Sequence, residues 1–74
     1  MVNVCILIRI HPGKANDAIA ALRGVAEIRE FFPVFGRYDF VAFANVADHR
    51  AAVALAGKIN SLSAIRSTET LIEA

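Results

Sequence analysis

The first ten residues carry the pattern that most restricts the fold. Every second residue from position 2 to position 10 is a β-branched aliphatic residue, which is typical of a strand with a buried face. The intervening positions include Cys5 and Leu7, so the opposite face of the same strand is partly apolar as well. A sheet with helices on one side and water on the other has a cleaner alternation. We therefore expect a strand here, in a sheet whose two faces are both covered.

A helix and two strands are predicted after this first strand. His11-Pro12-Gly13 ends it, because proline and glycine interrupt regular structure. Apolar residues at helical spacing follow, namely Ala15, Ala18, Ile19, Leu22 and Ala26. Gly24 stands where a glycine often ends a helix. Strands are then predicted over 28–35 and 38–44, and Pro33 favours an edge strand or a bulge in the first of them.

A second helix and a fourth strand complete the chain. Asp48 is a suitable N-cap, and the apolar stripe of the helix consists of Ala52, Leu55, Ile59 and Leu62. Residues 65–72 have the composition of a strand. The resulting order is βαββαβ, which predicts an α+β, ferredoxin-like fold with both helices on one face of an antiparallel sheet.

The composition indicates an oligomer. The 74 residues permit one domain, 1–74, yet 57% of them are hydrophobic and only 20% are charged. A domain of this size buries only about 60% of the surface of its unfolded chain. The simplest cover for the second sheet face is the same face of another copy. We therefore expect two sheets to pack together about a two-fold axis, as in dimeric α/β barrels.

Charge and composition exclude several classes of function. The chain has eight Lys and Arg residues and seven Asp and Glu residues, and the basic residues form no stripe. No direct nucleic-acid binding is therefore expected. A single cysteine fits a reducing compartment. No signal peptide is recognisable, and no apolar run approaches the roughly 20 residues that cross a membrane. The sequence predicts a cytoplasmic protein without membrane contact.

No catalytic or metal site stands out. His11 and His49 have no neighbour in the sequence that resembles a catalytic partner, and surface positions are the simplest interpretation. Cys5 lies among apolar strand residues, which predicts a buried, inert thiol. The side chains that bind metals lack the spacing of a metal site. We expect no catalytic residue, metal or cofactor.

The segment 34–40 is the best candidate for a binding site. Gly36 permits a turn conformation that side chains disfavour and lets a ligand approach the backbone. Asp39 either accepts hydrogen bonds from nearby backbone, as aspartate often does in turns, or acts as a ligand carboxylate. A second polar patch spans 67–70, where the threonines are either ordinary strand residues or part of a site. Glu69 is within reach of Arg37 or Arg66 for a salt bridge.

Several short motifs occur in a recognisable order. They are Pro12-Gly13-Lys14, Leu22-Arg23-Gly24-Val25, Val34-Phe35-Gly36-Arg37-Tyr38-Asp39-Phe40, Val46-Ala47-Asp48, Ile59-Asn60-Ser61-Leu62-Ser63-Ala64-Ile65 and Thr68-Glu69-Thr70. With these motifs the chain resembles the effector-binding (RAM) domain of the Lrp/AsnC family over nearly its whole length. Ala64-Ile65 replaces the Gly-Val of the family before the last strand, a departure that concerns the turn rather than the fold.

The resemblance implies a function and a site. It implies dimers with sheets packed face to face, which assemble into octamers or decamers and bind a small amino-acid effector between neighbouring dimers. Gly36 would let the effector approach the backbone, and Asp39 would help to hold its head group. Tyr38 would be a further ligand-binding residue of the hairpin. Thr68 and Thr70 would line the pocket from the last strand. The resemblance is to the form without the winged helix-turn-helix of the full-length regulators, so we expect a role in transcription regulation through a DNA-binding relative or through another partner.

Two other functions stay open at this point. A small dimeric α/β-barrel enzyme of the monooxygenase type would bury its substrate between sheet and helices, and a deeply buried His11 or His49 beside a cavity would favour it. A purely structural assembly domain without an effector is the other alternative.

Overall fold

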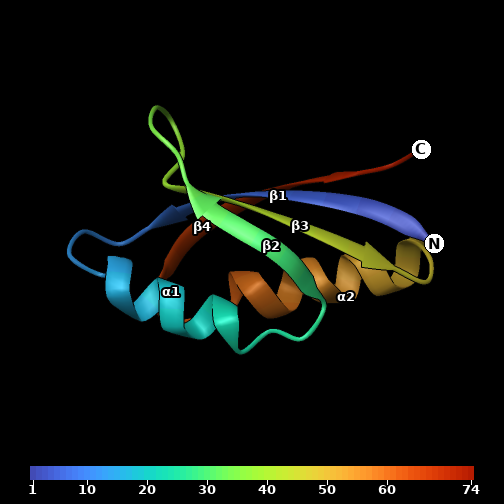
Figure 1. Ribbon diagram of the computed structural model, residues 1–74, viewed down its shortest axis with the longest axis horizontal. Coiled ribbons are helices and arrows are strands. Elements are labelled where there is room, and N and C mark those ends of the chain that lie inside the picture. The colour runs from blue at the N-terminus through green and yellow to red at the C-terminus, as the bar shows by residue number, and fades with distance from the viewer.

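The chain folds into one sheet with two helices on one side (Figure 1). A computed structural model describes all residues, 1–74, and its elements are β1 (Val2–Ile10), α1 (Ala15–Arg23), β2 (Ile28–Pro33), β3 (Phe40–Val46), α2 (His49–Asn60) and β4 (Ile65–Ile72). The strand order is β2-β3-β1-β4, and all three pairs of neighbours are antiparallel. The predicted βαββαβ, ferredoxin-like fold is confirmed.

The alternation in β1 divides the sheet into two faces. Val4, Ile6 and Ile8 are at most 2% exposed and belong to one core cluster with the buried residues of both helices. We call this side the inner face. The opposite side, which we call the open face, carries Cys5 and Leu7, both half-buried. Because β1 lies between β3 and β4, its two faces set the two faces of the whole sheet.

The helices were predicted well except at their ends. Ala18 and Leu22 of α1 are buried as expected, but Ala26 is exposed and lies beyond the helix, which already stops at Arg23. Gly24 is the C-cap, as predicted, in a right-handed conformation with φ −81°. The core therefore receives only two turns of α1.

The second helix begins at its predicted cap. The Asp48 carboxylate accepts a 2.8 Å hydrogen bond from the backbone N–H of Ala51, which satisfies one of the free donors at the helix start. Ala52, Leu55 and Ile59 are buried. The fourth predicted member of this stripe, Leu62, lies beyond the helix and is half-buried against the core.

The boundaries of the middle strands differ from the prediction. β2 ends at Pro33 rather than at residue 35, and β3 begins at Phe40 rather than at residue 38. The apolar residues Val34 and Phe35 thus belong to a wider loop. Pro33 lies in an edge strand, as expected, whereas the register shift of β2 occurs between Ile28 and Glu30.

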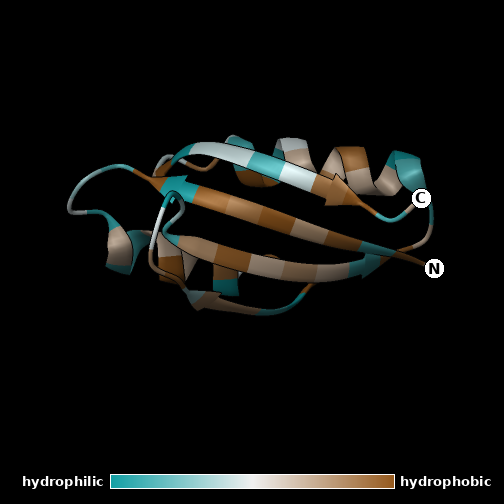
Figure 2. Cartoon of the chain, turned by 90° about the horizontal axis from the view of Figure 1, so that it is seen from above, coloured by the Kyte–Doolittle hydropathy of each residue, from teal (hydrophilic) through white to brown (hydrophobic).

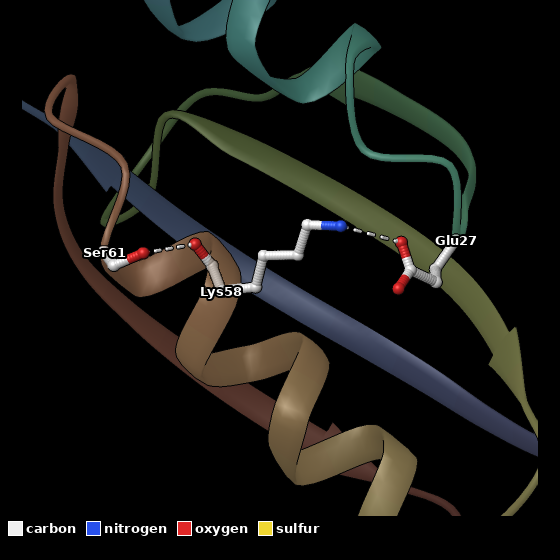
Figure 3. A network of polar contacts seen from close by, with 3 residues as sticks. All are labelled: Glu27, Lys58 and Ser61. Carbon is white, nitrogen blue, oxygen red and sulfur yellow. Dashed lines mark hydrogen bonds and ion pairs between the residues drawn. The ribbon is translucent and has the colours of Figure 1, made fainter.

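An ion pair links α2 to the segment before β2 (Figure 3). Lys58 Nζ lies 3.4 Å from Glu27 Oε1, and the hydroxyl of Ser61 donates to the carbonyl oxygen of Lys58 at 2.8 Å. Hydrogen bonds from the backbone N–H of Glu27 itself and from Lys58 lower the pKa of the Glu27 carboxyl. The ion pair therefore ties the last turn of α2 to the connection that follows α1. Neither helix is long and apolar enough to cross a membrane.

Candidate functional site

The hairpin between β2 and β3 is built around one glycine. Val34 N–H donates to the carbonyl oxygen of Asp39 at 3.0 Å and closes the loop at its base. Gly36 at the tip has φ +119°, a conformation that side chains rarely adopt, and no atom lies within 4 Å of where a Cβ would stand. The backbone conformation, and not a lack of space, therefore requires glycine here. The same open space leaves the backbone accessible.

Asp39 joins the hairpin to the end of β1. Its N–H donates to the carbonyl oxygen of Ile8 at 2.8 Å, and its Oδ2 accepts a 2.9 Å hydrogen bond from the N–H of Ile10. Hydrogen bonding to backbone was one of the two roles predicted for this carboxylate, and the structure shows that bond. Its other oxygen, Oδ1, accepts no hydrogen bond from the protein. The aspartate therefore keeps a free acceptor oxygen at the base of the loop.

Tyr38 connects the hairpin to the last strand. Its hydroxyl donates a 2.6 Å hydrogen bond to Oε1 of Glu69 in β4. This hydrogen bond is the main reason that the pKa of Tyr38 is raised, and the nearby charges of Arg37 and Arg9 oppose the shift. The salt bridge that was predicted for Glu69 is not formed, and its Oε1 accepts from Tyr38 instead.

The two candidate threonines lie on the other side of the sheet. Thr70 is opposite Ile6 and Thr68 is opposite Ile8 in the β1–β4 register, so both side chains share the inner face. Thr68 Oγ1 donates to Oδ1 of Asn60 at 3.3 Å. Glu69, between them, is on the open face with Tyr38. Within one chain the five predicted residues therefore do not meet in one cavity.

The backbone of the two threonines is nevertheless available to a ligand. Glu73 N–H donates to the carbonyl oxygen of Asn3, and in an antiparallel pair such bonds recur at every second residue. The N–H and C=O groups of Thr68 and Thr70 therefore point away from β1. Because β4 is an edge strand, they lie along a free edge.

The open face carries an apolar surface and two hollows. Phe32, Phe43 and Leu71 are exposed there by 44%, 36% and 52%, and Figure 2, which looks onto this face, shows β1 hydrophobic along most of its length. A hollow of about 310 Å³ lies over β1, β3 and β4 and is lined by Asn3, Val4, Cys5, Phe43, Leu71, Ile72 and Glu73. A second, of about 380 Å³, is lined by Asn3, Val4, Arg29, Glu30, Phe43 and Ala44.

Neither hollow contains a predicted site residue or a histidine. His11 is exposed, and His49 is exposed with Nε2 3.0 Å from the carbonyl oxygen of Glu73. No group of three or more potential metal ligands is present. The arrangement that would favour the monooxygenase alternative, a buried histidine beside a cavity, is therefore not found.

Comparison with known proteins identifies the family. The model of the Lrp/AsnC ligand binding domain matches residues 3–73. This chain belongs to the Lrp/AsnC family. Its resemblance to that family, predicted from the short motifs, is confirmed, whereas no match was found among curated protein sequences.

Solved Lrp/AsnC structures of two lengths resemble this chain. FFRP-DM1 is 25% identical with a TM-score of 0.91, and the match covers 100% of both chains. E. coli AsnC is 29% identical with a TM-score of 0.86, and the match covers 96% of this chain but 49% of AsnC. The feast or famine regulatory protein of M. tuberculosis, solved in complex with L-methionine, is 26% identical with a TM-score of 0.84 over 97% of this chain and 49% of its own. The chain spans about half of these two regulators.

Sequence reasoning missed the pairing of Tyr38 with Glu69 and the hollow beside Phe43. The 31 residues between Tyr38 and Glu69 leave no local signal of their contact. An apolar surface on the open face could have been predicted from the sequence, because its apolar residues alternate with those of the core.

Proposed function

We propose that this Lrp/AsnC ligand-binding domain is a non-enzymatic module that binds a small amino-acid effector, oligomerises and acts in transcription regulation through a partner in the cytoplasm. The family match over residues 3–73 supports the ligand-binding role. The complex of the M. tuberculosis relative with L-methionine supports an amino acid as the class of effector. The partner is a DNA-binding member of the same family, and the effector changes how the two assemble.

The position of Tyr38 is the observation that carries the proposal. Its hydrogen bond to Glu69 fixes the hairpin with respect to β4 of the same copy, so each copy presents its hairpin and its β4 edge in a fixed relation to its neighbours. Gly36 offers accessible backbone, and Oδ1 of Asp39 offers a free acceptor for an ammonium group. The free edge at Thr68 and Thr70 offers donors and acceptors for a carboxylate and an amine.

The effector site lies between copies of the chain. Within one copy the threonines face the helices while Tyr38 is on the open face, so one chain does not enclose a ligand. The hairpin of one copy beside the β4 edge of another would bring both groups together. This arrangement places Gly36, Tyr38 and Asp39 on one side of the effector and Thr68 and Thr70 on the other.

Calorimetric titration with each of the twenty amino acids tests effector binding. Asp39→Asn is the informative variant, because its amide oxygen can still accept from the N–H of Ile10 while the negative charge is lost. We expect at least one amino acid to bind and Asp39→Asn to weaken it about tenfold or more, which corresponds to about 1.4 kcal/mol. Asp17→Asn, on the exposed side of α1, is the matched control. The absence of binding by every amino acid would contradict the proposal.

A second copy covers the open face in this proposal. Phe32, Phe43 and Leu71 are exposed on this face, and exposed apolar patches often mark interaction surfaces. We expect Phe43→Glu to dissociate the dimer in size-exclusion chromatography with light scattering. Val53→Glu, at a 64% exposed position of α2, is the control. A monomeric wild-type protein would contradict the assembly, whether or not an amino acid binds. Dimers are proposed to assemble further into octamers or decamers.

The hydrogen bond between Asp39 and Ile10 favours a second candidate function. The Asp39 carboxylate already accepts a hydrogen bond from the backbone and needs no ligand for that role, so the domain could be purely structural. Intact assemblies that bind none of the twenty amino acids would support this alternative.

A further inference from the structure

Phe35 is the most exposed large apolar residue of the chain. Its exposed fraction of 107% means that it makes almost no contact within its own chain. It lies in the loop between β2 and β3, next to Gly36, and Figure 1 shows this loop rising on the side of the sheet away from the helices. An aromatic ring is costly to leave in water and is a frequent anchor of interfaces. The loop that carries Phe35 therefore lies on the side that a second copy covers in the proposed dimer.

The apolar hollow on the open face lies toward the other end of the sheet. Pro33, at the base of the hairpin, is opposite Phe40, whereas Cys5, in the hollow, is opposite Phe43. Three strand residues separate these positions, which is about 10 Å. With a volume of about 310 Å³, the hollow exceeds the roughly 150 Å³ of an apolar cavity that holds benzene.

We propose that Phe35 of one copy packs into the hollow formed by Cys5, Phe43 and Leu71 of a second copy, and that the second copy returns the same contact. This rests on the proposed face-to-face dimer. A two-fold axis between the sheets and across the strands places the hairpin end of each copy over the opposite end of the other. A two-fold interface is self-complementary, so the contact of one hairpin tip with the hollow of the second copy is repeated by the other tip.

The charges beside the two surfaces are complementary. Arg37 follows Phe35 by two residues and forms no salt bridge within its own chain. Glu73 lines the hollow, where its Oε1 accepts a 2.9 Å hydrogen bond from Asn3 N–H. A cation beside the ring thus faces an anion beside the hollow. Phe35 serves as an anchor between copies, while the backbone of Gly36 and the side chains of Tyr38 and Asp39 remain available to the effector.

The native cysteine allows a direct test. In Phe35→Cys the introduced thiol would lie in the hollow of the second copy, next to Cys5. Within one chain the two positions are about 10 Å or more apart along the strands, beyond the roughly 7 Å between Cα atoms that a disulfide spans. Mild oxidation is therefore expected to give a covalent dimer on a non-reducing gel, with position 35 joined to Cys5 in the mass spectrum of the linked peptides.

Two control variants make the cross-link specific. Val53→Cys, on the outer side of α2, is expected to give no link to Cys5. Phe35→Cys combined with Cys5→Ser is expected to lose the dimer band. Phe35→Ser, whose exposed position predicts normal folding by circular dichroism, is expected to raise the dimer dissociation constant at least tenfold.

Three outcomes would overturn the inference. A dimer that forms normally while position 35 and Cys5 do not link would refute the docking of Phe35 and leave the dimer intact. A ladder of covalent trimers and larger species would replace the two-fold contact by a head-to-tail one. A monomeric wild-type protein would remove the dimer itself. Loss of amino-acid binding alone affects none of these results, so the effector site is judged separately.

Discussion

The hydroxyl of Tyr38 donates a 2.6 Å hydrogen bond to Oε1 of Glu69, 31 positions later in the chain. The bond joins the hairpin to the edge strand β4 on the open face. It spans β1, which lies between β3 and β4 in the sheet. A change at either residue therefore alters the hairpin and the edge strand of the same copy together, and each of them contributes to a proposed effector site shared with a neighbouring copy.

The titration of Tyr38 reports this bond directly. The chain has one tyrosine and no tryptophan, so ultraviolet absorbance follows Tyr38 alone. Because the hydrogen bond to Glu69 stabilises the protonated hydroxyl, we expect a pKa above the ordinary value of about 10. Glu69→Ala is expected to shift the midpoint down, while Glu30→Ala leaves it in place. A midpoint that is the same in wild-type and Glu69→Ala protein would mean that the bond is absent in solution.

The raised pKa of Tyr38 also makes stability depend on pH. The folded protein favours the neutral hydroxyl, so its contribution is fully present below the pKa of the unfolded chain and is lost as the pH rises through the folded pKa. We expect the stability advantage of the wild-type protein over Tyr38→Phe to disappear in strongly alkaline solution. Urea denaturation at a series of pH values measures it. If the stability advantage of the wild-type protein over Tyr38→Phe grew as the pH rises, the predicted direction of the pH dependence would be wrong.

Most of the fold could be predicted from local patterns. The alternation of residues 2–10, the cap at Asp48 and the β-rich segment 65–72 gave elements at their correct positions. These signals are local, because periodicity and capping depend on neighbours in the sequence. Ala26 was assigned to a helix that had already ended, since periodicity does not mark where a helix stops.

The sequence pattern located the hairpin but did not predict its contacts. Val34 and Phe35 have strand propensity, yet they leave β2 because the chain turns at Gly36 with a positive φ. Asp39 lies just outside β3, and its amide and carboxylate bind β1. These partners are distant in sequence, so the pattern could place the candidate site on the hairpin without showing that Tyr38 pairs with Glu69.

Two glycines are expected to respond in opposite ways to alanine. Gly36→Ala places a side chain at φ +119° and should cost about 1–2 kcal/mol of unfolding free energy, although there is space for a Cβ. Gly57→Ala, inside α2 with equally open surroundings, should stabilise the protein by about 0.5–1 kcal/mol. Chemical denaturation of the two variants measures the difference. Equal changes in the unfolding free energy of the two variants would show that the hairpin of Gly36→Ala relaxes away from the positive φ.

The carboxyl of Glu27 should titrate below its ordinary pKa. Its own backbone N–H and the ammonium group of Lys58 favour the charged form. Lys58→Gln is therefore expected to raise the pKa of Glu27 only in part, as followed by ¹³C NMR, and Lys14→Gln should leave it unchanged. The stabilisation is present above the unfolded pKa and is lost as the pH falls through the folded pKa. A full return to the ordinary pKa in Lys58→Gln would mean that the backbone contact is unimportant.

The start of α2 depends on a single side chain. Asp48 accepts from the N–H of Ala51, and no other acidic residue lies in the first turn. Asp48→Ala leaves this donor without a protein acceptor and should lower the unfolding free energy by about 1 kcal/mol, within a range of roughly 0.5–2. Asp48→Ser should recover most of the loss, because serine also caps helices. Asp17→Ala, an exposed change on α1, is expected to stay within about 0.5 kcal/mol of the wild type. If Asp48→Ala were as stable as Asp17→Ala, the burial of Ala52, Leu55 and Ile59 alone would hold the helix in place.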